Sequence, residues 1–220
     1  MSVPILALLA GKVQPFTRGE ASAIGKTPLT GPIKIGFLGI EGDEQADHRY
    51  HGGPDKALHH YPADHYPYFS QLAPGQDLLN APGAFGENIS TWGLLEEEVC
   101  IGDRFRCGTA LLEVSQGRQP CWKQGDRLEW TLLPALMVKQ RRSGWYYRVI
   151  EEGMAAEGDT LTLVDRPLPD WSVKRVFGLL IAGDWKRDPE ALPALRDMEL
   201  LFSGWRDHAA ALMDANISES

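Results

Sequence analysis

Short runs of alternating or continuous apolar residues dominate the first three quarters of the chain. Such runs predict β-strands, since side chains of a strand alternate between two faces and a buried strand is apolar on both. The runs that we interpret as strands cover residues 5–13, 33–37, 56–61, 145–149 and 158–164. Two or three short antiparallel strands are expected from residues 94–99, 101–108 and 110–114, and helices from residues 63–72 and 133–143.

The pattern changes near residue 167, where helical periodicity replaces the short strands. Apolar residues at i, i+3, i+4 and i+7 over residues 173–180 predict an amphipathic helix, with Asp170 or Ser172 as its N-cap. An Asp-Pro pair at residues 188–189 predicts the start of a second helix, and Ser203 predicts the start of a third. We interpret these helices as a C-terminal appendage to a strand-rich body.

The length of 220 residues is compatible with one large domain and one small one. We expect an α+β protein, mostly β, with a first domain over residues 1–166 and a three-helix domain over residues 167–220. The 23 glycines and 15 prolines favour many turns between short strands. Hydrophobic content of 43% and charged content of 24% are typical of an ordinary globular chain.

Charge narrows the classes of partner. A net charge of −8 argues against a general nucleic-acid binder or an anionic-membrane binder, because neutralising phosphates dominates such affinities. The longest apolar run, residues 176–183, is too short to cross a bilayer, and no basic residue precedes the apolar N-terminus as in a secretory signal. The odd count of three cysteines favours a reducing compartment, so we expect a cytoplasmic protein.

Candidate chemistry begins at the loop that follows the strand-like run 110–114. This loop contains Gly117 and Pro120 and ends at Cys121, with Arg118 before the cysteine and Lys123 after it. Nearby positive charge favours the thiolate, which is the nucleophile and the soft metal ligand. The alternative is a small buried apolar residue, which is what most free cysteines are, and we expect Cys100 and Cys107 to be of that kind.

The densest polar cluster lies in residues 41–57, with five carboxylates and two histidines in 17 residues. A zinc site built on His48 and His51 would need further ligands, and no cysteine pair stands at finger spacing. The alternative is a polar loop around a glycine turn. The Gly-Lys-Thr at residues 25–27 is not a nucleotide P-loop, because the glycine spacing is wrong and a proline follows at once. Ser22 and Lys26 remain candidates to hold a different anion.

Several motifs together resemble the MOSC domain family, and more closely its bacterial YiiM-like members. They occur in the order found in that family and span most of residues 1–165. The motifs are Ser22-Ala23-Ile24-Gly25-Lys26, Gly42-Asp43-Glu44-Gln45-Ala46-Asp47-His48, His51-Gly52-Gly53-Pro54-Asp55-Lys56-Ala57, Phe85-Gly86-Glu87-Asn88 and the loop from Ser115 to Cys121. The resemblance implies a β-barrel-like MOSC domain with a few helices, followed by a three-helix domain.

The resemblance also implies the molybdenum cofactor, Mo-molybdopterin, with Cys121 as the metal ligand. The pterin carries a phosphate, so basic residues are needed even in an acidic protein. The residues expected to bind the cofactor are Ser22, Lys26, Lys56, Asn88, Ser115 and Arg118. The catalytic residues expected are Cys121, His51 and Asp47. His51 and Asp47 would move protons at the metal or fix the His-Gly-Gly turn, and the turn role is favoured for Asp47.

The function implied is a reductase of small N-hydroxylated compounds, such as hydroxylamino purines and other N-hydroxylated bases. No iron–sulfur cysteine cluster or nucleotide fingerprint occurs in the sequence, so electrons would come from a partner redox protein. The alternative is a carrier that holds the cofactor or moves sulfur on it without substrate turnover. A third hypothesis is a metal-free interaction domain with Cys121 buried. We expect a monomer or homodimer that binds neither nucleic acid nor membrane.

Overall fold

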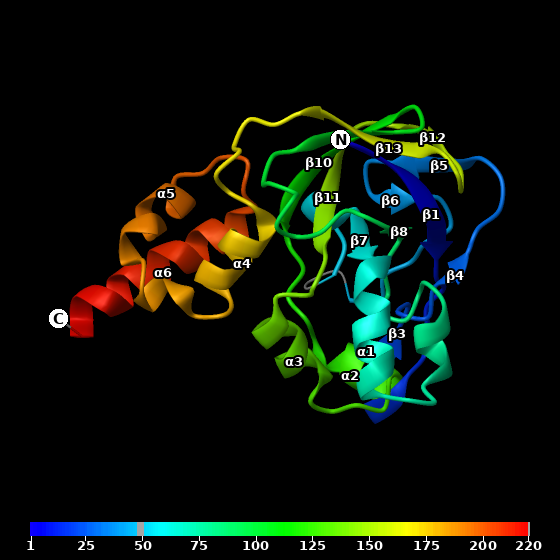
Figure 1. Ribbon diagram of the computed structural model, residues 1–220, viewed down its shortest axis with the longest axis horizontal. Helices are drawn as coiled ribbons and strands as arrows, with labels where there is room; N and C mark the ends of the chain where they lie inside the picture. Colours follow the sequence, from blue (N-terminus) through cyan, green and yellow to red (C-terminus); the bar gives the residue numbers. More distant parts are fainter. Residues whose placement is uncertain (48–50, 220) are drawn as a thin grey trace.

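The main feature of the molecule is a sheet that closes on itself. A computed structural model describes residues 1–47 and 51–219, with side chains through residue 215. Among these residues, eight strands follow the order β13-β9-β10-β11-β7-β8-β1-β4, and β13 also pairs with β1 to close the barrel (Figure 1). The strands are β1 (Ser2–Ala10), β4 (Thr27–Pro28), β7 (Leu58–Pro62), β8 (Ile89–Thr91), β9 (Arg104–Cys107), β10 (Ala110–Gly117), β11 (Trp145–Glu151) and β13 (Thr160–Asp165).

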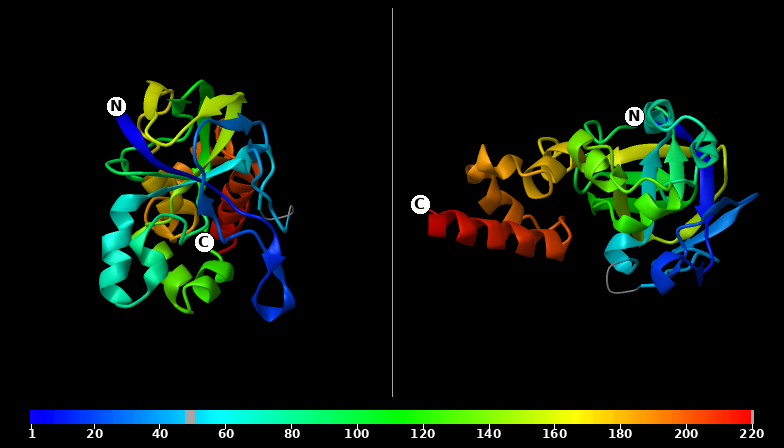
Figure 2. Two further views of the ribbon diagram at one scale, coloured as in Figure 1. Left: turned by 90° about the vertical axis from the view of Figure 1, so that its right-hand side faces the viewer. Right: turned by 90° about the horizontal axis from the view of Figure 1, so that it is seen from below.

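Smaller elements surround this barrel. A three-stranded sheet contains β12 (Gly153–Ala155), β5 (Ile33–Gly36) and β6 (Gly39–Ile40). A two-stranded ribbon contains β2 (Gln14–Pro15) and β3 (Ala21–Ser22). Beside one end of the barrel lie α1 (Tyr66–Leu72), α2 (Trp122–Arg127) and α3 (Leu133–Gln140). The single-turn 3₁₀ segments are Thr17–Gly19, Pro54–Lys56, Ala63–His65, Asp77–Asn80, Asp184–Lys186 and Pro189–Ala191. Figure 2 shows the same arrangement from two further directions.

The helices predicted for the C-terminal part are present. They are α4 (Val173–Leu180), α5 (Leu192–Arg196) and α6 (Ser203–Glu219), and they gather on one side of the barrel. The hydroxyl of Ser172 accepts a hydrogen bond from the backbone of Arg175, as expected of the predicted N-cap. The α+β, mostly β prediction with a barrel and C-terminal helices is therefore confirmed, whereas the domain boundary at residue 166 stays a prediction.

Most predicted strands are confirmed, but the strand expected over residues 94–99 is wrong. This segment forms turns, in which the Leu95 amide donates to the Glu98 carboxylate at 3.0 Å and the Glu98 amide donates to the Leu95 carbonyl at 2.9 Å. The amides that a neighbouring strand would have used are satisfied locally. The predicted helix over residues 133–143 ends earlier, at Gln140, because Arg141 adopts a left-handed conformation with φ of 54°.

The core runs from the barrel into the C-terminal helices without a break. One apolar cluster contains Phe105 and Tyr147 from the barrel together with Phe177 and Trp205 from α4 and α6. The end of β10 lies close to these helices, since a Cβ on Gly117 would come within 3.0 Å of the Trp205 ring. The C-terminal helices therefore pack directly on the strand that leads to Cys121. Within the described residues, no helix is long and apolar enough to cross a membrane.

Candidate functional site

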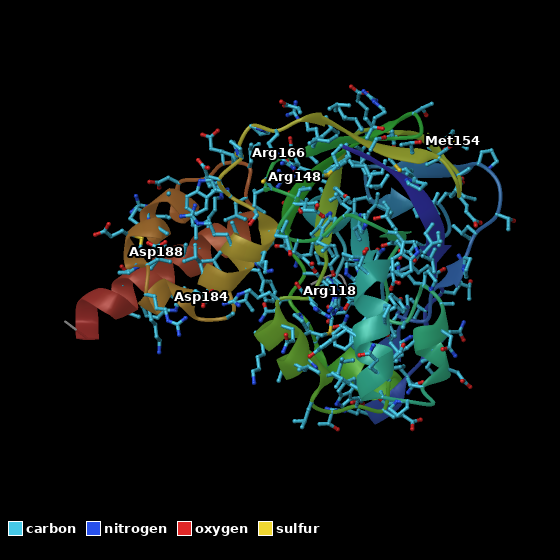
Figure 3. The ribbon with its side chains drawn as sticks, in the orientation of Figure 1. Arg118, Arg148, Met154, Arg166, Asp184 and Asp188 are labelled. Carbon is cyan, nitrogen blue, oxygen red and sulfur yellow. The ribbon has the colours of Figure 1, made fainter. Side chains whose placement is uncertain are left out.

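The predicted cysteine loop begins where β10 ends. The backbone amide of Arg118 donates to the Gly144 carbonyl at 3.0 Å, which fixes the first residue of the loop beside β11. Cys121 then adopts an extended conformation directly before α2. The guanidinium Nη2 of Arg118 lies 3.7 Å from Sγ of Cys121, and Arg118 itself lies between the barrel and the helices α2 and α3 (Figure 3). The cation expected to favour the thiolate is thus in contact with it.

This contact makes the Cys121 thiol unusually acidic. Burial alone would raise its pKa, but the Arg118 guanidinium and a hydrogen bond from His51 lower the pKa to about 6. Arg118 is only 4% exposed, and its guanidinium donates to the side chain of Gln124. No carboxylate in the described part of the chain forms an ion pair with Arg118. The Cys121 thiolate is therefore the natural counter-charge of this buried guanidinium.

A pocket that is open to solvent lies beside Cys121. Eight of the nine residues predicted from the sequence line it: Ser22, Lys26, Asp47, His51, Lys56, Asn88, Arg118 and Cys121. The ninth, Ser115, is buried inside β10, which extends three residues further than the predicted strand. Its Oγ lies 2.5 Å from the carbonyl oxygen of Asp55 and 3.2 Å from that of Tyr146. The structure thus gives Ser115 backbone partners, and its role as a pterin contact stays a prediction.

Asp43 joins several of the lining residues, and the sequence did not single it out. Its buried carboxylate pairs with the Lys26 ammonium and accepts hydrogen bonds from the Gly11 amide at 2.8 Å and the Asn88 amide at 2.8 Å. Burial lowers the pKa of Lys26, and the Asp43 carboxylate opposes that shift. The side-chain oxygen of Asn88 also accepts a hydrogen bond from the backbone amide of His59 at 3.1 Å. Asp43 and Asn88 therefore hold the ammonium of Lys26 at the pocket wall.

The His-Gly-Gly turn is constrained, as its two glycines indicate. Gly52 and Gly53 have φ of 85° and 88°, in the left-handed region that side chains other than glycine rarely adopt. The His51 amide donates to the Asp47 carbonyl at 2.9 Å, so Asp47 helps to place His51. His48 lies outside the described residues. Among the residues that are described, no group of three or more His, Cys, Asp or Glu side chains is placed to hold a metal ion.

Lys123 differs from the expectation. Its ammonium donates to the Ala21 carbonyl at 2.9 Å and lies 3.3 Å from the Glu20 carboxylate, and it does not pair with the thiol. The backbone amide of Lys123 hydrogen-bonds Cys121 and contributes to the lowered pKa of the thiol. Sequence neighbours share a loop, but the direction of a long side chain is set by partners elsewhere in the chain.

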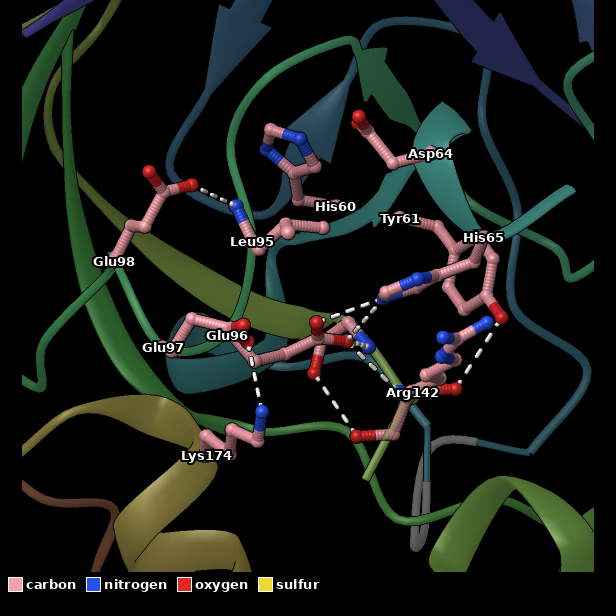
Figure 4. A network of polar contacts seen from close by, with 12 residues as sticks. His60, Tyr61, Asp64, His65, Leu95, Glu96, Glu97, Glu98, Arg142 and Lys174 are labelled. Carbon is pink, nitrogen blue, oxygen red and sulfur yellow. Dashed lines mark hydrogen bonds and ion pairs between the residues drawn. The ribbon is translucent and has the colours of Figure 1, made fainter. Parts of the chain in front are cut away.

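A second network of polar contacts surrounds Glu96 and supports the backbone beside the Cys121 loop (Figure 4). The buried Glu96 carboxylate binds His65 Nε2 at 2.7 Å and accepts the amides of Ser143 and Gly144 at 2.9 Å and 2.8 Å. The carbonyl of the same Gly144 accepts a hydrogen bond from the backbone amide of Arg118 at 3.0 Å. Glu96 lies in the segment wrongly predicted as a strand, and its carboxylate fixes the backbone that positions Arg118. No motif in the sequence signalled this role.

Other lining residues escaped the sequence reasoning. Gln45, His59 and Tyr146 also line the pocket. The pKa of His59 is well below its ordinary value, because the ring is buried and Arg118 and Lys26 are near. His59 is therefore neutral near pH 7. Its position in β7, beside a second histidine, gave no signal that this ring would line the pocket.

Comparisons with known proteins agree with this architecture. A family model of the MOSC domain matches residues 47–162. The protein YiiM of Escherichia coli (strain K12) is 45% identical over 156 residues, 71% of this chain and 70% of that protein. A protein named "Reductase" from Gibberella moniliformis is 39% identical over 175 residues, 78% of this chain, but the match spans only 31% of the fungal protein. The crystal structure of YiiM from Geobacillus stearothermophilus superposes with a TM-score of 0.79 at 31% identity, covering 96% of this chain and 99% of that chain.

Proposed function

The chain belongs to the MOSC domain family, and on that premise we propose that it is a molybdenum cofactor-dependent reductase of N-hydroxylated compounds. Hydroxylamino purines and other N-hydroxylated bases are the substrate class, and a partner redox protein supplies the electrons. The observation that carries the proposal is the acidic Cys121 thiol beside the buried Arg118 guanidinium, at the wall of a pocket that Lys26 and Lys56 also line.

The pocket residues fit this cofactor chemically. A thiolate is the soft ligand that suits a metal already held by sulfur, and Cys121 is ionised near pH 7 because its pKa is about 6. The cations Lys26, Lys56 and Arg118 line the same pocket and suit a terminal phosphate. Lys26 shares its charge with the Asp43 carboxylate, and Arg118 shares its charge with the Cys121 thiolate.

When bound, the cofactor supplies two-electron redox chemistry at molybdenum. The overall reaction takes R–NH–OH, two electrons and two protons to R–NH₂ and water, with the N–O bond broken. Cys121 would hold the metal, and Arg118 keeps that sulfur anionic. His51 lines the pocket and hydrogen-bonds the thiol, so it is positioned to hold a proton at its ring nitrogen. Asp47 keeps His51 in place through its carbonyl.

Two further observations support the assignment as an oxidoreductase. The fungal relative is named a reductase, and it is much longer than this chain, so its additional length can carry other components. The cysteines available here are Cys100, Cys107 and Cys121, which are too few for a cysteine-ligated iron–sulfur cluster beside a molybdenum ligand. This count supports the proposal that electrons come from a partner redox protein.

The test is metal and pterin analysis of protein made in a host that synthesises the cofactor, comparing wild type with Cys121→Ala. We expect near-stoichiometric molybdenum and pterin in wild type, and loss of molybdenum or altered ligation in the variant. Reduction of a hydroxylamino purine with a reduced viologen dye should fall to background in Cys121→Ala. Cys107→Ala is the matched control, since it removes a thiol from the barrel core and should retain both metal and activity.

The outcomes separate the proposal from its alternative. Wild-type protein that binds neither molybdenum nor pterin would remove the premise. Stable cofactor without reduction of any N-hydroxylated base would favour a carrier. A transient persulfide on Cys121, detected by mass spectrometry, would favour the sulfur carrier in particular.

A further inference from the structure

The corner between α5 and α6 is attached to the strand that leads into the site. The backbone amide of Phe202, just before α6, donates to the Ser115 carbonyl at 3.0 Å. Two residues further along β10, Gly117 packs against α4 and α6 so closely that no side chain would fit without displacing Trp205. Gly117 precedes Arg118 directly. The C-terminal helices therefore touch the end of β10 immediately before the residue that contacts the thiol.

The same corner is attached to the turn that carries Lys56. Within the Pro54–Lys56 turn, the Asp55 carboxylate pairs with Arg148 at 2.6 Å. Nη1 of Arg148 donates to the Leu200 carbonyl, between α5 and α6, at 3.0 Å, and Arg148 lies on the side of the barrel facing those helices (Figure 3). The Asp55 carbonyl in turn accepts the Ser115 hydroxyl. One set of hydrogen bonds thus fastens the corner, β10 and the turn to one another.

One side chain reaches from the corner to the pocket lining. Nζ of Lys56 lies 4.8 Å from the centroid of the Phe202 ring, within the range of a cation–π contact. The Phe202 ring packs against Gly204 and occupies the space that a side chain there would need. A Cβ on Gly204 would come within 2.6 Å of the ring. Lys56 also lines the pocket beside Cys121. Phe202 therefore contacts a pocket cation from a part of the chain outside the barrel.

We propose that Phe202 is a positioning residue for Lys56, and that through it the C-terminal helices set how tightly the pocket binds an anionic phosphate group. A lysine side chain has several rotatable bonds, and ordering it on binding costs free energy. The ring attracts the ammonium and restricts its positions, so part of that ordering is already achieved before the ligand arrives. The inference rests on the proposed function only in assigning the phosphate contact to Lys56.

The experiment uses cofactor-free full-length protein and inorganic phosphate as the probe. NMR signals of the Lys56 side chain are assigned by their loss in Lys56→Met. A proton above an aromatic ring is shifted upfield, so we expect Phe202→Leu to remove that shift, and Phe202→Tyr, which keeps the ring, to retain it. The phosphate dissociation constant should rise about two- to fivefold in Phe202→Leu and stay near the wild-type value in Phe202→Tyr, as a cation–π contact of ordinary strength implies.

Two further variants guard against a merely structural effect. Gly204→Ala keeps Phe202 but displaces its ring, and it should weaken phosphate binding as Phe202→Leu does. Trp171→Leu removes another cation–π contact of the C-terminal part, with Arg175 at 4.3 Å, and should change neither readout. Lys56 signals unchanged in Phe202→Leu would overturn the inference. If Lys56→Met leaves phosphate binding unaltered, the phosphate role of Lys56 fails, while the Lys56 signals still decide whether Phe202 positions it.

Discussion

Cys107 and Cys121 lie on either side of β10 and behave in opposite ways. Cys107 ends β9 in the barrel core, is fully buried, and has a pKa raised to about 12 by burial and the nearby Asp159. Cys121 follows β10 in the loop, and its pKa is lowered to about 6. Burial opposes the thiolate at both positions. The difference comes chiefly from the Arg118 guanidinium beside Cys121, with a smaller contribution from His51, and neither group acts on Cys107.

The comparison shows how an ordinary barrel acquires a reactive site. The closed sheet provides low-dielectric surroundings, which on their own make a cysteine inert. The loop adds the buried Arg118 guanidinium, which donates to Gln124, while the Arg118 backbone amide is fixed by the Gly144 carbonyl. A charge in those surroundings acts more strongly than it would in water. The burial that silences Cys107 therefore also strengthens the effect of Arg118 on Cys121.

The largest expected effect comes from removing that cation. In cofactor-free Arg118→Met, burial is opposed only by the smaller contributions of His51 and the Lys123 amide, so the pKa of Cys121 should rise from about 6 towards its ordinary value. The acid dissociation constant would fall by roughly 100-fold or more, given an ordinary thiol pKa of about 8.5. The measurement is the pH midpoint of thiolate absorbance near 240 nm, with alkylation of Cys121 followed by mass spectrometry. Cys121 should then be mostly protonated near pH 7, as Cys107 is.

Arg127→Met is the matched control for this variant. Arg127 is also a partly buried arginine near the pocket, but its guanidinium donates to the carbonyls of Gly83 and Ala84. Its loss should leave the Cys121 midpoint near 6. A midpoint that stays near 6 in Arg118→Met would place the stabilisation of the thiolate elsewhere, and the contrast with Cys107 would lose its explanation.

The two thiols should also give opposite slopes of stability with pH in cofactor-free protein. For Cys121 the folded pKa is below the unfolded value, so between about pH 6 and 8.5 the unfolded state binds more protons and the contribution to stability rises with pH, by at most about 1.4 kcal/mol per unit. That contribution is lost as the pH falls through about 6. For Cys107 the folded pKa is raised, so its contribution is present below about pH 8.5 and decreases above it.

Denaturant unfolding at several pH values checks these signs. The difference in the free energy of unfolding between wild type and Cys121→Ser should grow from pH 6 to 8.5. The difference between wild type and Cys107→Ala should shrink above pH 8.5. Slopes of the same sign for both residues would contradict the opposite electrostatics that we assign to the two positions.

The elements of the fold were largely predictable because their signals are local. Period-two runs and the Ser172 cap required only neighbouring residues, and the strands and helices that they predicted are present. The segment over residues 94–99 misled because its apolar residues do become buried, yet the buried Glu96 and the turn-forming Glu98 use their carboxylates to bind backbone amides. The pattern of apolar residues indicates burial, but it does not show which acceptor each backbone amide will hydrogen-bond.

The site was predictable only as a set of residues. Motifs shared with a family named Lys26 and Asn88, and the structure brings both to one pocket wall. That Asp43 connects them was not readable, because the partners lie 17 and 45 residues away in the chain. The contact between Lys56 and Phe202 bridges the barrel and the C-terminal helices and has no periodic or motif signal. Long-range pairing is set by the closed sheet and not by local sequence.

The smallest expected effect concerns the second cation of the loop, and it sharpens the comparison most. Lys123 directs its ammonium to the Ala21 carbonyl and Glu20, while its backbone amide is the group that favours the Cys121 thiolate. Lys123→Met removes the charge and keeps the amide, so the acid dissociation constant of Cys121 should change by less than about twofold, because that charge is already paired with Glu20. The thiolate titration described for Arg118→Met measures it. A shift as large as that of Arg118→Met would mean that the total positive charge of the loop lowers the pKa, and that contact with one guanidinium does not separate Cys121 from Cys107.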